Sequence, residues 1–214
     1  AEVAAMCRKR GVLVHTDAAQ AVGKVPVDVD YLGVDLLTVA GHKLYAPKGI
    51  GALFVREGVE IQPLIRGAGH ERRLRAGTEN ILEIVGLGAA CEILAQDLTD
   101  EMGRLVSLRN GLRHGLAGGF VGLIEHGHPF ERLSNTLSVS FPGVNAGELL
   151  DVMGDDVAAS AGAACHGNQV QVSHVLSAMG VEPEVALGTV RFSVGRFTTE
   201  EEIDEAVRKI LMFV

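Results

Sequence analysis

The sequence lacks long apolar runs, disulfide spacing and an excess of positive charge. No apolar run approaches the roughly 18 residues that a membrane-spanning helix needs, so we expect no membrane insertion. The three cysteines, Cys7, Cys91 and Cys165, have no framework spacing, which predicts a reducing compartment, by default the cytoplasm. With 19 Lys and Arg residues against 27 Asp and Glu residues, the net charge of −8 argues against nucleic-acid binding.

The composition is typical of a folded globular protein. At 214 residues, 47% hydrophobic and 21% charged, the chain has enough apolar surface for one or two domain cores. Up to about residue 98 short apolar strands alternate with helices, which is the pattern of a doubly wound α/β domain. From about residue 99 the pattern becomes mixed α+β. We therefore predict a domain over 1–98 and a smaller one over 99–214, with a helix over 80–98 leading from the first to the second.

Helix and strand signals divide the second part further. We expect a helix over 100–116, a Gly- and His-rich loop over 117–129 and an alternating strand over 136–141. Asn145 is expected to cap a helix over 147–153, and Ser173 a later one that ends at Gly180 in a left-handed turn. Before the last helix, residues 198–202 hold two overlapping capping boxes.

Lys43 is the residue whose sequence context points most clearly to a chemical role. It follows the apolar run 36–40, Gly41 and His42, and a run of this kind predicts a buried strand of a parallel sheet. A lysine at the carboxyl end of such a strand lies where α/β sheets bind ligands. Burial would lower its pKa and favour the neutral amine that attacks carbonyls. The alternative is a surface lysine at the start of a loop.

Asp17 is the first residue that we expect to lie near Lys43. It follows a predicted strand over 11–15, one β-α-β unit before the lysine, so both groups are expected at one crevice. Asp17 is suited to a protonated ring nitrogen and Gln20 to a ring substituent. A carboxylate for a pyridinium and a Schiff-base lysine are the two parts that a pyridoxal 5'-phosphate site needs. Taken alone, Asp17 is equally typical of a helix N-cap.

Motifs along the whole chain resemble one family in the same order. They are HTDAAQAVGK at 15–24, GVDLLTVAGHK at 33–43, PKGIGALFV at 47–55, GAGHERRLRAGTEN at 67–80, LSNTLSVSFPG at 133–143, SAGAACHG at 160–167, SHVLSAMG at 173–180 and VRFSVGRFTTEEEID at 190–204. The sequence is similar to the pyridoxal-phosphate-dependent cysteine desulfurases and their relatives, the selenocysteine lyases, which are class-V aminotransferase-like. The resemblance implies an α/β protein of the aspartate-aminotransferase type (fold type I). In this chain it corresponds to the rear half of the large cofactor domain and a small α+β domain with the cysteine loop.

The resemblance also implies a role for each matching residue. Lys43 would bind the cofactor and move protons at the substrate Cα, and Cys165 would accept sulfur from L-cysteine as a persulfide. Arg191 would bind the substrate carboxylate. The residues implied in cofactor binding are Asp17 at the ring nitrogen, Gln20 at the phenolic oxygen, His42 at the phosphate, and Thr78, which in a homodimer would reach the neighbouring subunit's cofactor.

Two departures from the family pattern keep an alternative open. Many desulfurases have a serine where this chain has Ala40, so a phosphate contact is lost unless Thr38, on the same face of the strand, compensates. The segment at 159–166, which ends in Ala164-Cys165-His166, also departs from the desulfurase form. Both departures resemble the selenocysteine lyase branch, which acts on L-selenocysteine.

Functions other than that of a complete enzyme also remain open for this chain. Relatives have a long stretch before the point that matches Ala1, so the chain resembles the carboxyl-terminal portion of a longer protein. It is then either part of a desulfurase that delivers sulfur to an acceptor or scaffold protein, for iron–sulfur clusters or other uses, or a non-catalytic partner-binding module. No metal site is expected, because His126 and His128 are read as an exposed loop pair without a third ligand.

We expect Cys165 to lie on an exposed, mobile loop, whereas Cys7 and Cys91 fall in helical apolar patterns and are expected to pack in a core. A loop cysteine without a role is the alternative for Cys165.

Overall fold

The computed structural model describes residues 1–154, 156–166 and 169–214, without the side chains of 163–166 and 169–171. The chain forms two compact units, Ala1–Leu98 and Thr99–Val214, and each is described by itself. The assignment of the first unit to the rear part of a cofactor domain stays a prediction.

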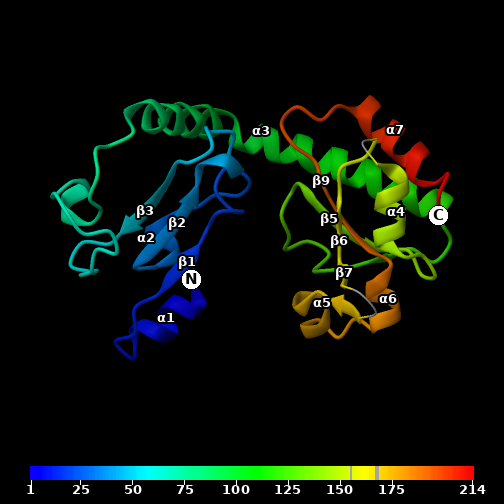
Figure 1. The fold of residues 1–214 in the computed structure, drawn as a ribbon, viewed down its shortest axis with the longest axis horizontal. Coiled ribbons are helices and arrows are strands. Elements are labelled where there is room, and N and C mark those ends of the chain that lie inside the picture. Colours follow the sequence, from blue (N-terminus) through cyan, green and yellow to red (C-terminus); the bar gives the residue numbers. More distant parts are fainter. Residues whose placement is uncertain (155, 167–168) are drawn as a thin grey trace. The chain divides into compact units, whose positions relative to one another are not determined.

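The first unit is built on a three-stranded sheet in the order β1-β2-β3 (Figure 1). Its elements are α1 (Glu2–Arg8), β1 (His15–Asp17), α2 (Val29–Leu32), β2 (Leu36–Ala40), the 3-10 turn η1 (Gly41–Lys43), β3 (Gly51–Val55), the 3-10 turn η2 (Glu71–Arg73) and the first part of α3 (Ile81–Gly119). β2 pairs parallel with β1 and antiparallel with β3. The sheet is therefore mixed rather than parallel.

The strand at 36–40 is confirmed, but its predicted full burial is wrong. Leu37 is buried together with Ala4, Ala18 and Val34, while the other residues of β2 are half-buried. The first strand begins at His15, not at residue 11, and Asp17 is its last residue. Val14 lies just before β1, and its backbone N–H donates a hydrogen bond to the carboxylate of Asp35, the residue before β2, at 2.8 Å.

The second unit is built on a four-stranded sheet in the order β4-β5-β9-β6 and a separate hairpin, β7-β8. Its elements are the second part of α3, β4 (Ile124–Glu125), β5 (Thr136–Ser140), α4 (Ala146–Met153), β6 (Ser160–Ala161), β7 (Ala163–His166), β8 (Gln169–Val172), α5 (His174–Ala178), α6 (Pro183–Leu187), β9 (Thr189–Ser193) and α7 (Glu200–Ile210). All pairs within the four-stranded sheet are antiparallel.

The four-stranded sheet has one apolar and one polar face. Side chains alternate along a strand, so Leu137 and Val139 of β5 share a face with Val190 and Phe192 of β9. This face packs on α3, α4 and α7 through buried residues that include Leu105, Leu108, Leu112, Leu116, Leu149, Met153, Ile203 and Ile210. The opposite face carries serine, threonine and arginine. The core thus lies on one side of the sheet, and the other side is available for polar chemistry.

The predicted helix caps are confirmed. Asn145 accepts a hydrogen bond from the Gly147 N–H, and Ser173 from the Val175 N–H. Gly180 has a φ of 72°, the left-handed conformation expected after the α5 end. Of the two overlapping capping boxes predicted, the one of Thr199 and Glu202 caps α7, whereas the Thr198 hydroxyl accepts from the Gly195 N–H.

The two helices predicted over 80–98 and 100–116 are one continuous helix, α3, from Ile81 to Gly119, so the start of the predicted loop at residue 117 is also wrong. In the described part of the chain, neither this 39-residue helix nor any other combines the length and apolarity required to cross a membrane.

Close packing at Gly188, between α6 and β9, generates a stability prediction. A Cβ on Gly188 would overlap the carbonyl oxygens of Phe141 and Val144. Gly188→Ala is therefore expected to lower the free energy of unfolding by about 1–3 kcal/mol, measured by urea denaturation. The matched control is Gly103→Ala in α3, where a Cβ meets nothing within 4 Å. Alanine is the better helix former there, so the control should gain up to about 1 kcal/mol. Equal effects of the two substitutions would contradict this account.

Candidate functional site

Asp17 and Thr38 lie side by side on one face of the first sheet. They are register partners in the parallel β1–β2 pair, so their side chains point to the same side. Asp17 is exposed, and its Oδ1 accepts a hydrogen bond from the Ala19 N–H at 2.8 Å. The turn at 19–24 that follows is not a helix, so the N-cap alternative is wrong and the carboxylate caps a turn. Its second oxygen, Oδ2, remains available for a ligand.

His15 is a site residue that the sequence reasoning missed. It lies two residues before Asp17 and therefore on the same face of β1. Its Nε2 is 2.7 Å from Thr38 Oγ1, so the hydroxyl is already engaged with an imidazole. The signal was present in the sequence as the first residue of the motif at 15–24.

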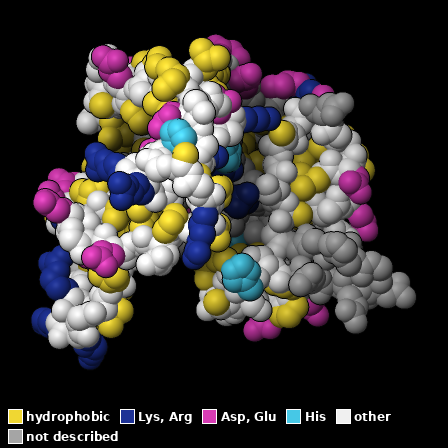
Figure 2. Space-filling model, turned by 60° about the vertical axis from the view of Figure 1, so that its left-hand side comes forward, with side chains coloured by type: hydrophobic (Ala, Val, Ile, Leu, Met, Phe, Trp, Pro, Cys, Tyr) yellow, Lys and Arg dark blue, Asp and Glu magenta, His cyan; other side chains and the backbone are white. Residues whose placement is uncertain are grey.

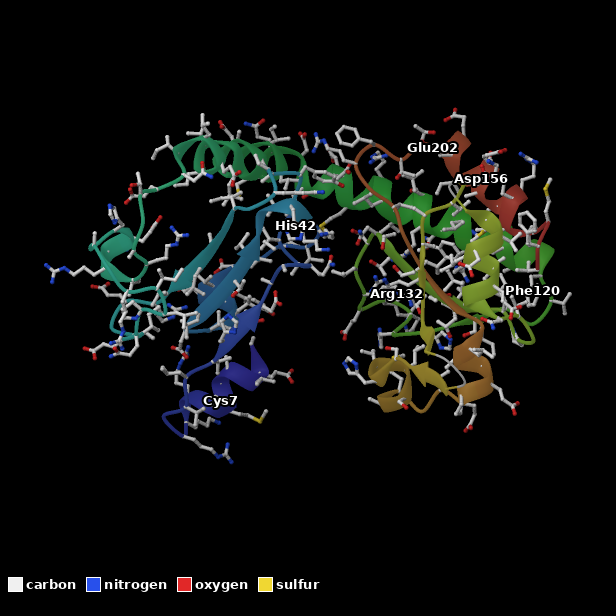
Figure 3. The ribbon with its side chains drawn as sticks, viewed as in Figure 1. Cys7, His42, Phe120, Arg132, Asp156 and Glu202 are labelled. Atoms are coloured by element: carbon white, nitrogen blue, oxygen red, sulfur yellow. The ribbon has the colours of Figure 1, made fainter. Side chains whose placement is uncertain are left out.

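Lys43 follows β2 directly in the turn η1, after His42 (Figure 3). The turn requires Gly41, because a Cβ there would be 2.7 Å from the Ile50 carbonyl oxygen. Leu44, only 1% exposed, packs with Ala90 and Leu94 of α3 and anchors the turn.

His42 and Lys43 themselves are exposed, so the predicted burial of Lys43 is wrong for the residues described here. The alternative of a lysine at the start of a loop fits this exposure, and the position at the strand end is as predicted.

Lys24 contacts the same turn. Its Nζ donates a hydrogen bond to the Lys43 carbonyl oxygen at 3.1 Å. Burial and, to a smaller extent, the charge of Lys43 lower the pKa of Lys24 below its ordinary value. A second amine therefore lies close to Lys43.

Gln20 and Thr78 are both exposed. Gln20 follows Asp17 in the turn after β1. Thr78 follows a segment that contains η2, in which Glu71, Arg72 and Arg73 all have positive φ. A cavity of about 600 Å³ lies in this segment and is lined by Pro63, Ile65, Arg66, Gly67, Ala68, Gly69, Arg73 and Ala76, but not by Thr78. Hydrophobic side chains also reach the surface (Figure 2), among them Leu64 and Leu82.

Arg191 lines a cavity on the polar face of the second sheet. The cavity has a volume of about 310 Å³ and is lined by His126, Gly127, Ser138, Ser160, Ala161, Gly162, Ser173, Val175, Leu176, Met179, Thr189 and Arg191. Among the lining residues, Arg191 is the one lysine or arginine. Ser138 and Ser160 are its register partners on the flanking strands, and Nη2 donates to Ser160 Oγ at 3.3 Å. The site suits a small carboxylate.

His126, expected on an exposed loop, is buried with only 8% exposure. Its Nε2 is 2.6 Å from Ser140 Oγ, which is 2.6 Å from Thr189 Oγ1. Burial lowers the pKa of His126 below its ordinary value of 6.5. The buried polar row thus crosses three strands beside Arg191. No cluster of metal-ligating side chains occurs in the described part of the chain.

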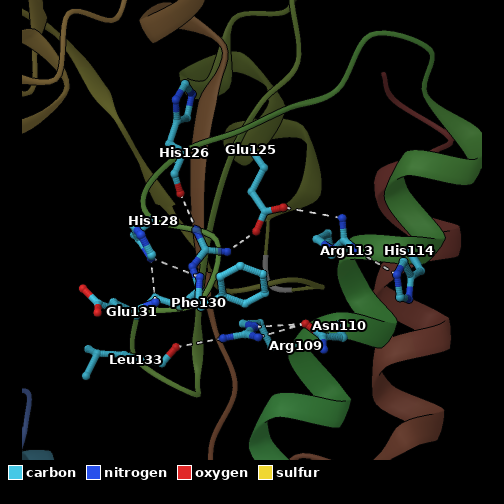
Figure 4. A network of polar contacts seen from close by, with 11 residues as sticks. Arg109, Asn110, Arg113, His114, Glu125, His126, His128, Phe130, Glu131 and Leu133 are labelled. Atoms are coloured by element: carbon cyan, nitrogen blue, oxygen red, sulfur yellow. Dashed lines mark hydrogen bonds and ion pairs between the residues drawn. The ribbon is translucent and has the colours of Figure 1, made fainter.

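Arg132 fixes the backbone of His126 (Figure 4). Its guanidinium donates to the His126 carbonyl oxygen at 2.5 Å and forms an ion pair with Glu125. Glu125 also faces Arg113 of α3 at 3.5 Å, and Arg109 donates to the Leu133 carbonyl oxygen at 3.0 Å. The loop between β4 and β5 is therefore attached to α3 at both ends.

Cys165 lies in a strand rather than in the predicted open loop. Its backbone is in β7 and is the register partner of Val170 in β8. The Cys165 side chain lies outside the described residues. Cys91, expected in a core, is exposed, and Cys7 is half-buried.

Comparisons with known proteins all indicate the same family. A family model described as Aminotransferase class-V matches residues 1–206. Cysteine desulfurase IscS of Escherichia coli O139:H28 is 46% identical over 218 residues, which cover 98% of this chain and 52% of that protein. The chain thus spans about half the length of the curated relatives it matches.

Solved structures of NifS-like proteins also match the chain. A NifS-like protein has a TM-score of 0.89 at 37% identity, over 99% of this chain and 55% of its own. A NifS-like protein from Rickettsia africae also has a TM-score of 0.89, at 27% identity, over 100% of this chain and 57% of its own.

The buried imidazole generates a pH prediction. Because the folded-state pKa of His126 lies below 6.5, the unfolded chain binds a proton first as the pH falls. The contribution of His126 to stability is therefore lost as the pH drops from about 6.5 towards the lower folded-state value. His126→Gln should show a shallower decline of the unfolding free energy between about pH 7 and pH 5. The exposed His174, replaced by glutamine, is the control and should keep the wild-type slope. Identical slopes for wild type and His126→Gln would contradict the prediction.

Proposed function

Because the chain belongs to the class-V aminotransferase family, we propose that its protein is a pyridoxal-phosphate-dependent cysteine desulfurase. It releases sulfur from L-cysteine as a persulfide on Cys165 and forms L-alanine. The observation that carries the proposal is the β1–β2 pair. It holds Asp17 and Thr38 on one face and continues directly into the turn that carries His42 and Lys43.

The groups on these two strands fit the cofactor chemically. Asp17 has a carboxylate oxygen for the protonated pyridine nitrogen, and Gln20 an amide for the phenolic oxygen. Thr38 and His42 offer a hydroxyl and an imidazole to the phosphate, and Lys43 an exposed amine for the carbonyl carbon. The turn at Gly41 has no room for a Cβ, so the backbone passes close to the β3 start. When bound, pyridoxal phosphate withdraws electrons from the substrate Cα.

Within that chemistry the side chains have separate tasks. Asp17 keeps a proton on the ring nitrogen through its negative charge. Lys43, once displaced by the substrate amine, accepts and returns the proton at Cα. Thr38 takes over the phosphate contact that Ala40 lacks, and the contact with His15 orients its hydroxyl. Arg191 binds the substrate carboxylate on the polar face of the second sheet.

Cys165 accepts the sulfur. Its thiolate attacks the sulfur of L-cysteine, the Cβ–S bond breaks, and the carbon receives a proton. L-Cysteine and the Cys165 thiol thereby become L-alanine and the Cys165 persulfide.

The partners in this proposal are a second copy of the chain and a sulfur acceptor. In the homodimer, Thr78 reaches the phosphate of the neighbouring site. An acceptor or scaffold protein takes the persulfide sulfur in the cytoplasm, for iron–sulfur clusters or other sulfur transfer. The relative reported at 46% identity is named a cysteine desulfurase, so selenocysteine lyase activity is not favoured.

The cofactor assignment is tested by replacing Lys43. In the complete protein, Lys43→Ala should lose the visible absorption band of the lysine-bound cofactor, and the rate of alanine formation should fall by about 10²–10⁴-fold. Borohydride reduction of wild type should attach the cofactor to the peptide that contains Lys43, as read by mass spectrometry. The exposed Lys48, replaced by alanine, is the control that keeps band and label. A label on any other lysine would refute the assignment.

The sulfur step is tested by replacing Cys165. Cys165→Ala should keep the absorption band and lose sulfide release from L-cysteine, because no thiol remains to accept the sulfur. Cys91→Ala, which changes an exposed cysteine, is the control and should keep wild-type release. If Cys165→Ala retains the full rate while Lys43→Ala loses it, the persulfide role is wrong. Selenide release from L-selenocysteine that survives in Cys165→Ala would favour the lyase.

A further inference from the structure

The turn over 19–24 packs against η1, the turn that carries Lys43. The contact is close at Gly23, which has a φ of 77°. A Cβ built on Gly23 would be 2.7 Å from a methyl carbon of Leu94 in α3 and 3.5 Å from Leu44 Cβ. Leu44 is the residue after Lys43 and is only 1% exposed. Because the two turns are in contact at Gly23, the residue that follows it is held beside η1.

That residue is Lys24, and its side chain contacts the backbone of Lys43. Its Nζ donates a hydrogen bond to the Lys43 carbonyl oxygen at 3.1 Å, across 19 positions of the chain. Lys24 is half-buried, and this burial lowers its pKa, with a smaller contribution from the charge of Lys43. The protonated amine is therefore less favourable here than in water. A lysine at a position that disfavours its charge indicates a task for the amine beyond solubility.

Lys43 depends on its backbone for the direction of its side chain. The side chain is exposed and has a flexible four-carbon stem, so packing does not fix it. At the start of η1, the Gly41 N–H donates to the Ile50 carbonyl oxygen at 3.0 Å. At its end, the Lys43 carbonyl oxygen accepts from Lys24. Both ends of this short turn are therefore held, which fixes the Cα–Cβ direction of Lys43.

The same segment connects Lys43 to the strand end that carries Asp17. Ala18 follows Asp17 directly, and its N–H donates to the Thr38 carbonyl oxygen in β2 at 3.0 Å. At its other end the segment is attached to η1 through Lys24. The carboxylate and the amine of the proposed cofactor site are thus joined by one short segment that is bonded at both ends.

We propose that Lys24 is a positioning residue for Lys43. Its amine holds the Lys43 carbonyl oxygen and thereby sets the direction in which the Lys43 side chain leaves η1, relative to Asp17. The proposal rests on the proposed function, in which Lys43 accepts and returns the proton at the substrate Cα. Proton transfer requires a fixed distance between amine and carbon, and a displacement of about 1 Å costs up to about 10²-fold in rate. Lys24 acts through Lys43 and touches neither substrate nor cofactor.

The first test reads the hydrogen bond without cofactor or turnover. In the complete protein freed of cofactor, the carbonyl ¹³C resonance of Lys43 should move upfield in Lys24→Met, because methionine has no N–H to donate. Lys24→Arg retains N–H donors and should keep the resonance near its wild-type position. Lys48→Met, which removes an exposed lysine, is the control and should cause no shift. An unchanged resonance in Lys24→Met would overturn the proposal.

A second variant covers the case in which methionine prevents folding. Lys24→Gln is polar, but its amide nitrogen ends one bond short of the lysine nitrogen. It should therefore lose the contact and give the same upfield shift. A wild-type resonance in a folded Lys24→Gln protein would equally contradict the role of Lys24.

The second test separates positioning from stability. Rates of alanine formation are expressed per Lys43 that borohydride labels with cofactor, so unfolded protein is not counted. Lys24→Met should lower kcat by about 10–10²-fold and leave KM for L-cysteine unchanged, because Arg191 on the second sheet binds the substrate carboxylate. Lys24→Arg should recover most of kcat. A wild-type kcat in Lys24→Met, or no recovery in Lys24→Arg, would show that Lys24 only supports the fold.

The two proposals fail separately. If borohydride labels a lysine other than Lys43, the proposed function is wrong, and a shifted carbonyl resonance then shows that Lys24 only stabilises the turn. If Lys43 is labelled as expected but Lys24→Met keeps the wild-type kcat, the proposed function stands and the positioning role of Lys24 is wrong.

Discussion

Both candidate sites depend on the alternation of side chains along paired strands. In the second sheet this alternation places Val190 and Phe192 in the core and Thr189 and Arg191 on the opposite face. In the first sheet it places Asp17 beside Thr38 while Leu37 packs inward. A shift of register by one residue would exchange the faces, so burial of the apolar side chains fixes where the polar groups point.

Burying polar side chains on the second sheet costs free energy, and hydrogen bonds between those side chains offset this cost. Ser140 and Thr189 are 0% and 1% exposed, and an unpaired buried hydroxyl costs about 1–3 kcal/mol. The contacts from His126 through Ser140 and Thr189 to Val185 satisfy both hydroxyls with protein partners. The same contacts hold the imidazole of His126, a residue that lines the cavity, in place.

Local signals in the sequence were strong enough to predict several features. The strand at 36–40 and the caps at Asn145, Ser173 and Thr199 were predicted correctly, because each depends on residues within a few positions. Predictions that depended on burial were less accurate. Lys43 is exposed where burial was expected, and His126 is buried where exposure was expected. Exposure depends on what packs against a segment, and the neighbours in sequence do not contain that information.

The sequence by itself determined the family and the identity of the chemical groups, because motifs from His15 to Asp204 occur in the family's order. The tertiary structure decided which of these groups meet. His126 and Ser140 are 14 residues apart in the chain, and Ser140 and Thr189 are 49 apart. Only the pairing of β4, β5 and β9 brings their polar atoms within hydrogen-bonding distance.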